Sequence, residues 1–155
     1  MTSKKVGKIY KDLLLRICLI GIIILIINIF FYQLCIVDGV SMEPTLTNGK
    51  IVFIKKYNLD LKHNDIVVVR KNGKIIIKRL VGLPKDKLKI DEYLYVNGIK
   101  NDELYTKDSG QLQEEMELKE NEYFVLGDNR QNSIDSRFSE IGIIYENEII
   151  GKIME

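Results

Sequence analysis

The sequence predicts a mainly β domain preceded by a single membrane-spanning helix. Residues 17–37 form an uninterrupted apolar stretch, in which Asn28 and Gln33 are the only strongly polar members. A helix needs about 20 residues to cross a hydrocarbon core of about 30 Å. Beyond Val37 the pattern changes to short β-branched runs separated by turn residues, which is typical of strands.

The predicted strands are rich in Val, Ile and Tyr, and they lie at residues 51–54, 66–69, 75–77, 88–90, 94–96, 123–126 and 149–153. Asn72-Gly73 predicts a hairpin turn, and Asn97-Gly98 predicts a second turn. The polar segment 107–121 predicts a loop. Runs 66–69 and 75–77 are apolar throughout, so we expect both faces of these strands to be covered, by protein or in one case by lipid.

Charges beside the apolar stretch predict its orientation. Against the single acidic Asp12, the basic residues that precede the stretch are Lys4, Lys5, Lys8, Lys11 and Arg16. The positive-inside rule then puts the N-terminus in the cytoplasm. We therefore expect a basic cytoplasmic segment at 1–16, a transmembrane signal-anchor at 17–37 and an extracytoplasmic β domain at 38–155, in a single-pass protein of the cell membrane.

Two other interpretations of the apolar stretch are weaker. A cleaved signal peptide needs an h-region of roughly 7 to 15 residues and an A-x-A-like site, whereas the chain is free of alanine. A lipid anchor at Cys35 would follow the bulky pair Gln33-Leu34, which does not suit such processing. We favour an uncleaved anchor, with Cys35 as an apolar filler.

The cysteine, histidine and charge content disfavours several kinds of site. Both cysteines, Cys18 and Cys35, lie in the apolar stretch, and His63 is the only histidine. This pattern disfavours a disulfide framework, a zinc site and a Ser-His relay, so we expect no metal and no cofactor. The net charge of +1 also argues against nucleic acid as a partner.

Ser41 begins the segment SMEPTL, four residues beyond the apolar stretch. Three motifs, S-M-x-P-T-L, K-R-x-x-G-L-P and G-D-N-R-x-N-S-x-D-S-R, occur together with the run DIVV in the segments 38–46, 65–68, 78–86 and 127–137. Their order and spacing resemble those of bacterial type I signal peptidases, in the short form typical of Gram-positive bacteria. Any one motif alone would be weak.

The resemblance implies a serine/lysine dyad, with Ser41 as the nucleophile and Lys78 as its general base. A serine needs such a base for activation. An ordinary lysine has a pKa of about 10.4 and is protonated at neutral pH, so it must be buried to act as a base. Lys78 stands between apolar residues of a predicted strand, which favours burial over a solvated surface position.

Other roles also follow from the resemblance. Ser133 would orient the lysine amine, and the backbone N–H groups of Ser41 and Gly39 would stabilise the oxyanion, since Gly39 stands where some family members carry a serine. The supporting residues would be Met42, Pro44, Arg79, Asp128, Asp135 and Arg137. Among them Arg79 would pair with Asp128 and Asp135 with Arg137, while Met42 would pack at the mouth of the site and Pro44 would fix the turn. Without the resemblance, segment 127–137 would be a polar turn.

The implied substrates are exported preproteins with small side chains at the first and third positions before the cut (−1 and −3), presented as an extended strand. Tethering beside the lipid bilayer would raise the effective concentration of enzyme toward them. Two alternatives remain: a self-cleaving repressor of the related serine/lysine type, which would need a DNA-binding domain, and a catalytically silent membrane-anchored assembly protein that keeps the fold.

Overall fold

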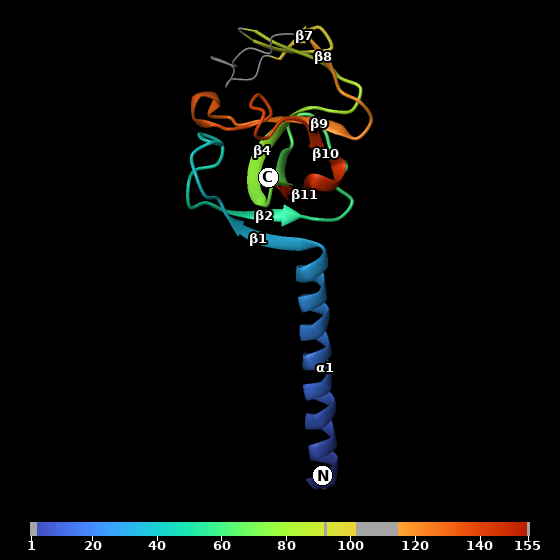
Figure 1. The fold of residues 1–155 in the computed structure, drawn as a ribbon. Coiled ribbons are helices and arrows are strands. Elements are labelled where there is room, and N and C mark those ends of the chain that lie inside the picture. Colours follow the sequence, from blue (N-terminus) through green and yellow to red (C-terminus); the bar gives the residue numbers. More distant parts are fainter. Residues whose placement is uncertain (1–2, 92, 102–114, 155) are drawn as a thin grey trace.

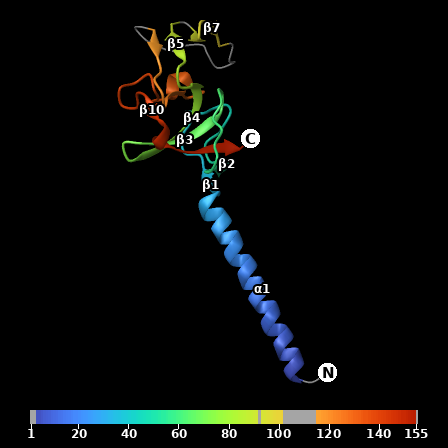
Figure 2. The same ribbon diagram turned by 90° about the vertical axis from the view of Figure 1, so that its right-hand side faces the viewer.

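The computed structural model describes residues 3–91, 93–101 and 115–154. One long helix, α1 (Ser3–Phe30), extends away from a β domain that contains the rest of the described chain. Figures 1 and 2 show from two sides that α1 stands clear of this domain. The mainly β fold with one N-terminal helix is as predicted.

The helix predicted at 17–37 ends earlier than expected. α1 begins at Ser3 and ends at Phe30, and β1 (Tyr32–Ile36) follows as a strand. β1 pairs antiparallel with β2 (Ile51–Lys55) along its whole length, and these ladder hydrogen bonds favour a strand where periodicity could not decide. Among the residues that the structure describes, no helix is both long enough and apolar enough to cross a membrane.

Two antiparallel sheets form the domain. The larger has the strand order β1-β2-β11-β3-β4-β9-β10, and its further strands are β3 (Ile66–Lys71), β4 (Lys74–Gly82), β9 (Glu122–Leu126), β10 (Ile144–Tyr145) and β11 (Ile149–Met154). The smaller has the order β7-β6-β5-β8 and contains β5 (Lys87–Ile90), β6 (Leu94–Val96), β7 (Ile99–Lys100) and β8 (Met116–Glu117). In Figure 1 the smaller sheet lies at the end of the domain far from α1.

All seven predicted strands are present. The loop predicted at 107–121 is interrupted by β8, and its residues 107–114 lie outside the described part of the chain. Short 3-10 turns lie at Arg130–Asn132 (η1) and Glu146–Glu148 (η2).

Both predicted Asn-Gly turns are confirmed. Asn72 and Gly73, with φ of 51° and 77°, join β3 to β4, and Asn97 and Gly98, with φ of 54° and 78°, join β6 to β7. Two successive positive φ angles are what the tight hairpin turn of type I′ requires.

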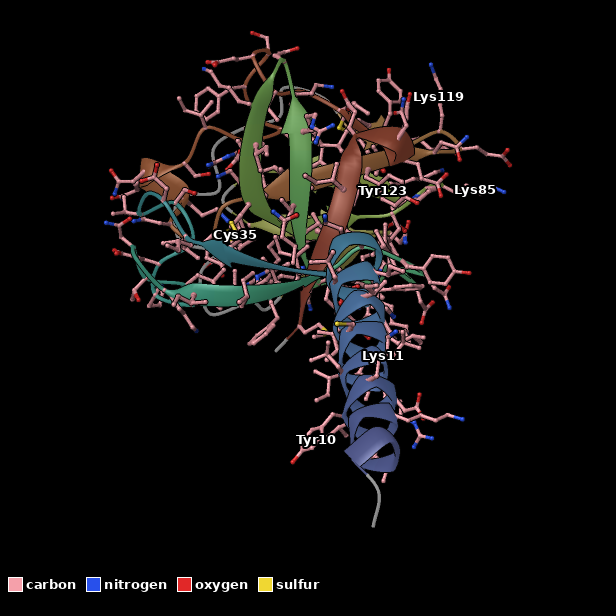
Figure 3. The ribbon with its side chains drawn as sticks, turned by 90° about the horizontal axis from the view of Figure 1, so that it is seen from below. Tyr10, Lys11, Cys35, Lys85, Lys119 and Tyr123 are labelled. Carbon is pink, nitrogen blue, oxygen red and sulfur yellow. The ribbon has the colours of Figure 1, made fainter. Side chains whose placement is uncertain are left out.

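The core covers both faces of β3, as predicted. Ile66 and Val68 belong to one buried cluster, and Val67 and Val69 belong to another. Cys35, labelled in Figure 3, packs against the first of these clusters as an apolar filler. The protein itself leaves Ile75 58% exposed, so cover of residues 75–77 by lipid stays a prediction.

β4 changes from exposed to buried along its length, which positions the site. Its first half pairs with β3 alone, whereas from Arg79 onward it is also flanked by β9. Lys78 therefore lies where the strand enters the interior. The segment between β1 and β2, and the segment after β9, carry the other two motifs toward this point.

Lys85 adopts φ of 74°, a left-handed conformation that costs a non-glycine residue about 1–2 kcal/mol. Its exposed side chain projects from the domain (Figure 3), and among the described residues its one ion pair is a surface pair with Glu120, which contributes little. We expect Lys85→Gly to raise the free energy of unfolding by about 0.5–1 kcal/mol, after the entropic cost of glycine is subtracted. Urea unfolding of the detergent-solubilised chain measures this.

The matched control is Lys87→Gly, in β5, where φ is not positive. That change should lower stability by about 0.5–1 kcal/mol, as glycine does in strands. A Lys85→Gly protein that is no more stable than the wild type would contradict the strain at Lys85.

Candidate active site

Ser41 and Lys78 meet at the centre of the site. Lys78 Nζ lies 2.7 Å from Ser41 Oγ, within hydrogen-bond reach. Lys78 is 4% exposed, whereas Ser41 is partly exposed. The serine is therefore partly open to solvent, while the lysine that contacts it is buried.

Burial lowers the pKa of Lys78 below its ordinary value, chiefly because desolvation penalises the ammonium form. The charge of Asp135 opposes this shift, the charge of Arg137 adds to it, and Asp128 opposes it. A lowered pKa makes the neutral amine easier to populate. Lys78 can then accept the proton of a hydroxyl at hydrogen-bond distance.

The first buried ion pair joins Arg79 to Asp128. Arg79 Nε donates to Asp128 Oδ1 at 2.7 Å and Nη2 donates to Oδ2 at 2.6 Å, which is the two-point geometry that favours arginine. Asp128 Oδ2 also accepts from Thr45 Oγ1 at 2.6 Å. Because Arg79 follows Lys78 in β4, this network ties the strand that carries Lys78 to the turn that carries Ser41.

The second buried ion pair joins Arg137 to Asp135, with Nε to Oδ1 at 2.8 Å and Nη2 to Oδ2 at 2.9 Å. Asp135 Oδ2 accepts from the Gly127 N–H at 2.9 Å, while the Gly127 carbonyl accepts from Arg130 Nε at 2.9 Å. Gly127 is thereby held on both sides of its backbone.

Ser133 lies beside these groups but makes no bond to the lysine. It is 5% exposed, and its Oγ has no hydrogen-bond partner within the described residues. A Cβ built on Gly127 would lie 2.1 Å from that Oγ and 2.6 Å from the Ser41 carbonyl oxygen, so Ser133 and Ser41 pack around the same glycine. Orientation of the amine by Ser133 stays a prediction.

The Gly39 N–H donates to Asn48 Oδ1 at 3.0 Å, so it would have to exchange this acceptor to bind an oxyanion, and its role as an oxyanion donor stays a prediction. The φ of 99° at Gly39 explains the glycine. The Ser41 N–H, by contrast, has no acceptor in the part of the chain that the structure describes.

Met42 and Pro44 lie in the turn that carries Ser41, and they differ in burial. Met42 is 1% exposed and belongs to the core cluster that includes Leu46 and Val52. It is a packing residue, as expected, but it packs in the core and not at the mouth of the site. Pro44 is exposed within the turn, and its role in presenting Ser41 stays a prediction.

Sequence reasoning assigned no role to four residues that the structure places here: Thr45, Gly127, Asn129 and Arg130. The Asn129 N–H donates to the Ser41 carbonyl at 3.0 Å. All four lie inside the motifs that carried the resemblance, and membership of a motif was the available signal. Their hydrogen bonds join segments that are distant in sequence.

Titratable groups elsewhere do not join the site. The ring of His63 lies 2.7 Å from Asp86, in the connection between the two sheets. Within the described ranges, no three His, Cys, Asp or Glu side chains gather as metal ligands.

The chain is similar to known proteins over most of its length. The family model for signal peptidase, peptidase S26, matches residues 10–155. The chain is 35% identical to signal peptidase I U of Bacillus subtilis strain 168, covering 97% of this chain and 89% of that protein. It is also 35% identical to signal peptidase I of Bacillus licheniformis, over 84% of this chain and 78% of the relative.

Among solved structures, a signal peptidase I from Enterococcus faecalis V583 matches with a TM-score of 0.51 and 28% identity, covering 61% of this chain and 97% of the other. Fold and relatives together define a serine peptidase. The chain belongs to the signal peptidase family, peptidase S26.

Gly127→Ala should disable the site. The added Cβ would meet Ser133 Oγ and Cβ at 2.1 and 2.4 Å and the Ser41 carbonyl at 2.6 Å, so the nucleophile turn must move. We expect a loss of peptidase activity of about 100-fold or more, since small displacements of reacting groups have effects of that size, and a loss of stability of about 1–3 kcal/mol. Activity and urea unfolding measure the two effects.

Gly7→Ala is the matched control, because nothing lies within 4 Å of its added Cβ. It should leave activity unchanged. Near-normal activity in Gly127→Ala would show that the close packing around Gly127 is not required.

Lys78→Met should stabilise the protein while abolishing its chemistry. The folded-state pKa of Lys78 is lowered, so folding releases a proton at pH values between that pKa and the ordinary 10.5. The penalty is full below the folded pKa and disappears as the pH rises toward 10.5. We expect Lys78→Met to raise the free energy of unfolding by about 0.5–2 kcal/mol near neutral pH. Loss of the hydrogen bond to Ser41 should cost little, because this serine is partly exposed and water can replace the amine.

Urea unfolding between pH 7 and pH 10 tests this, with the advantage of Met over Lys shrinking as the pH rises. Lys74→Met, at an exposed position of the same strand, is the control and should show no such trend. An advantage that is absent at neutral pH or independent of pH would contradict the cost of the buried amine.

Proposed function

We propose that this protein is a membrane-bound serine endopeptidase that removes N-terminal signal peptides from exported preproteins, with Ser41 as the nucleophile and Lys78 as the general base. The observation that carries the proposal is the 2.7 Å separation of Lys78 Nζ and Ser41 Oγ, with Lys78 buried and its pKa lowered. The relatives named signal peptidase I supply the substrate class.

The reaction is an acyl transfer in two halves. Ser41 Oγ attacks the carbonyl carbon of the scissile bond while its proton passes to Lys78 Nζ. The ammonium of Lys78 then gives that proton to the leaving amine as the bond breaks, which leaves an ester on Ser41. Water attacks the ester while Lys78 again takes a proton, and the Lys78 ammonium then returns that proton to Ser41 Oγ as the signal peptide leaves with a new carboxyl group.

Substrate binding and location complete the proposal. Preproteins would bind as extended strands with small side chains at the first and third positions before the cut. Apolar side chains of α1 from Leu13 to Ile27 are exposed, which supports insertion of this helix into the cell membrane. We place the anchor in α1 as far as Phe30, because β1 begins at Tyr32, with the N-terminus cytoplasmic and the β domain outside.

A catalytically silent assembly protein is the alternative, and one assay separates the two. Purified full-length protein in detergent should cleave a preprotein that carries a small-x-small site. Ser41→Ala and Lys78→Ala should each lower kcat by about 10⁴-fold or more, since members of a catalytic unit fail together. Mass spectrometry of the products would locate the cut.

Lys74→Ala removes an exposed lysine of the same strand and should cleave like the wild type. Folding of every variant is checked by thermal unfolding. A folded wild type that cleaves in neither detergent nor lipid would favour the silent protein, whereas cleavage by Lys78→Ala would require a different base.

A further inference from the structure

Asn129 contacts both peptide groups that flank the α-carbon of Ser41. Its side-chain Nδ2 donates to the Val40 carbonyl at 3.2 Å, and its backbone N–H donates to the Ser41 carbonyl at 3.0 Å. One residue from the segment after β9 therefore holds the nucleophile turn on both sides of the reactive serine.

The side-chain bond has a consequence for the N–H of Ser41. The Val40 carbonyl and the Ser41 N–H belong to the same peptide group, which is planar and trans, so the two bonds point in opposite directions. The Val40 carbonyl also accepts from the Glu43 N–H at 3.1 Å, so Asn129 and the turn itself both hold this carbonyl and direct the Ser41 N–H away from them. That N–H has no acceptor among the described residues, whereas the Gly39 N–H is engaged by Asn48.

The Asn129 amide is itself held in one orientation. The side-chain Oδ1 of Asn129 accepts from Asn132 Nδ2 at 3.1 Å. The backbone carbonyl of Asn129 accepts from the backbone N–H of Asn132 at 3.0 Å. The preceding residue, Asp128, is locked in the buried pair with Arg79. The Nδ2 donor is thus preset toward Val40 before any substrate arrives.

We propose that Asn129 is a positioning residue that orients the Ser41 N–H as the oxyanion donor of this peptidase. The inference rests on the proposed function. Asn129 touches no reacting atom and acts through the Val40–Ser41 peptide group. Its hydrogen bond to the carbonyl also polarises that group, which strengthens the N–H as a donor. The absence of a side chain at Gly39 makes this chain dependent on backbone donation.

Two substitutions remove the side-chain donor and keep the backbone N–H: Asn129→Leu, of similar size, and Asn129→Asp, which turns an acceptor toward the Val40 carbonyl. Loss of an oxyanion donor lowers kcat by about 100- to 1,000-fold. Misorientation should have a smaller effect, so we expect kcat for preprotein cleavage to fall about 10- to 100-fold with KM within about threefold. Asn147→Asp, at an exposed asparagine, is the matched control and should cleave normally.

A pair of inhibitors separates orientation of the donor from a structural role. Ser41 Oγ adds to the carbonyl carbon of a peptide aldehyde that ends in a small-x-small sequence. The serine proton passes through Lys78 to the aldehyde oxygen, which occupies the oxyanion position without any leaving group. The corresponding peptide alcohol cannot form this adduct. We expect both Asn129 variants to bind the aldehyde about tenfold or more weakly and the alcohol as the wild type does.

Each other result overturns the inference. Equal weakening of aldehyde and alcohol, or a fall in thermal stability that accounts for the lost activity, would show a structural role. Unchanged kcat and aldehyde affinity would show that the contact with Val40 is dispensable. If the wild type cleaves no preprotein and binds no aldehyde, the proposed function fails and this inference fails with it.

Discussion

The burial of one lysine amine is the constraint on which the rest of this structure depends. An amine can activate a serine at moderate pH only if its surroundings penalise the charged form, and desolvation is the largest influence on Lys78. That environment destabilises the folded state, so the strand that carries it must be stabilised elsewhere. β4 meets this need through pairing with β3 and β9 and through the buried clusters on both sides of β3.

The two ion pairs behind the dyad are better explained by geometry than by stability. Desolvation largely cancels the attraction within a buried pair, so such pairs contribute little net stability. Asp135 and Arg137 instead hold the segment after β9 close enough for Gly127 to pack against Ser133 and the Ser41 carbonyl. The same low-dielectric surroundings make a half-satisfied network costly, which explains why these carboxylates are bonded at both oxygens.

The sequence predicted the structures that depend on neighbouring residues, but not those that depend on contacts between distant segments. The β-branched runs and the Asn-Gly pairs predicted strands and hairpins correctly, because a positive φ at Asn72 depends on neighbouring residues alone. The end of α1 was not predicted, because an apolar run is compatible with either a helix or a strand. Pairing with β2 makes residues 32–36 a strand. Lys78 and Ser41 are separated by 37 positions, so resemblance rather than spacing suggested that they meet. The engagement of the Gly39 N–H by Asn48 required the folded turn.

The dipeptide Asp128-Asn129 joins the two halves of the site. Asp128 binds Arg79, the neighbour of Lys78, and also Thr45 in the turn that carries Ser41, while Asn129 binds the peptide groups around Ser41. Lys78 and Ser41 come from segments that are distant in sequence, and the proposed proton transfer requires their separation to hold to within a fraction of an ångström. Adjacent residues, the buried Asp128 and the partly buried Asn129, therefore fix the relative position of Lys78 and Ser41, while Ser41 itself stays partly open to solvent.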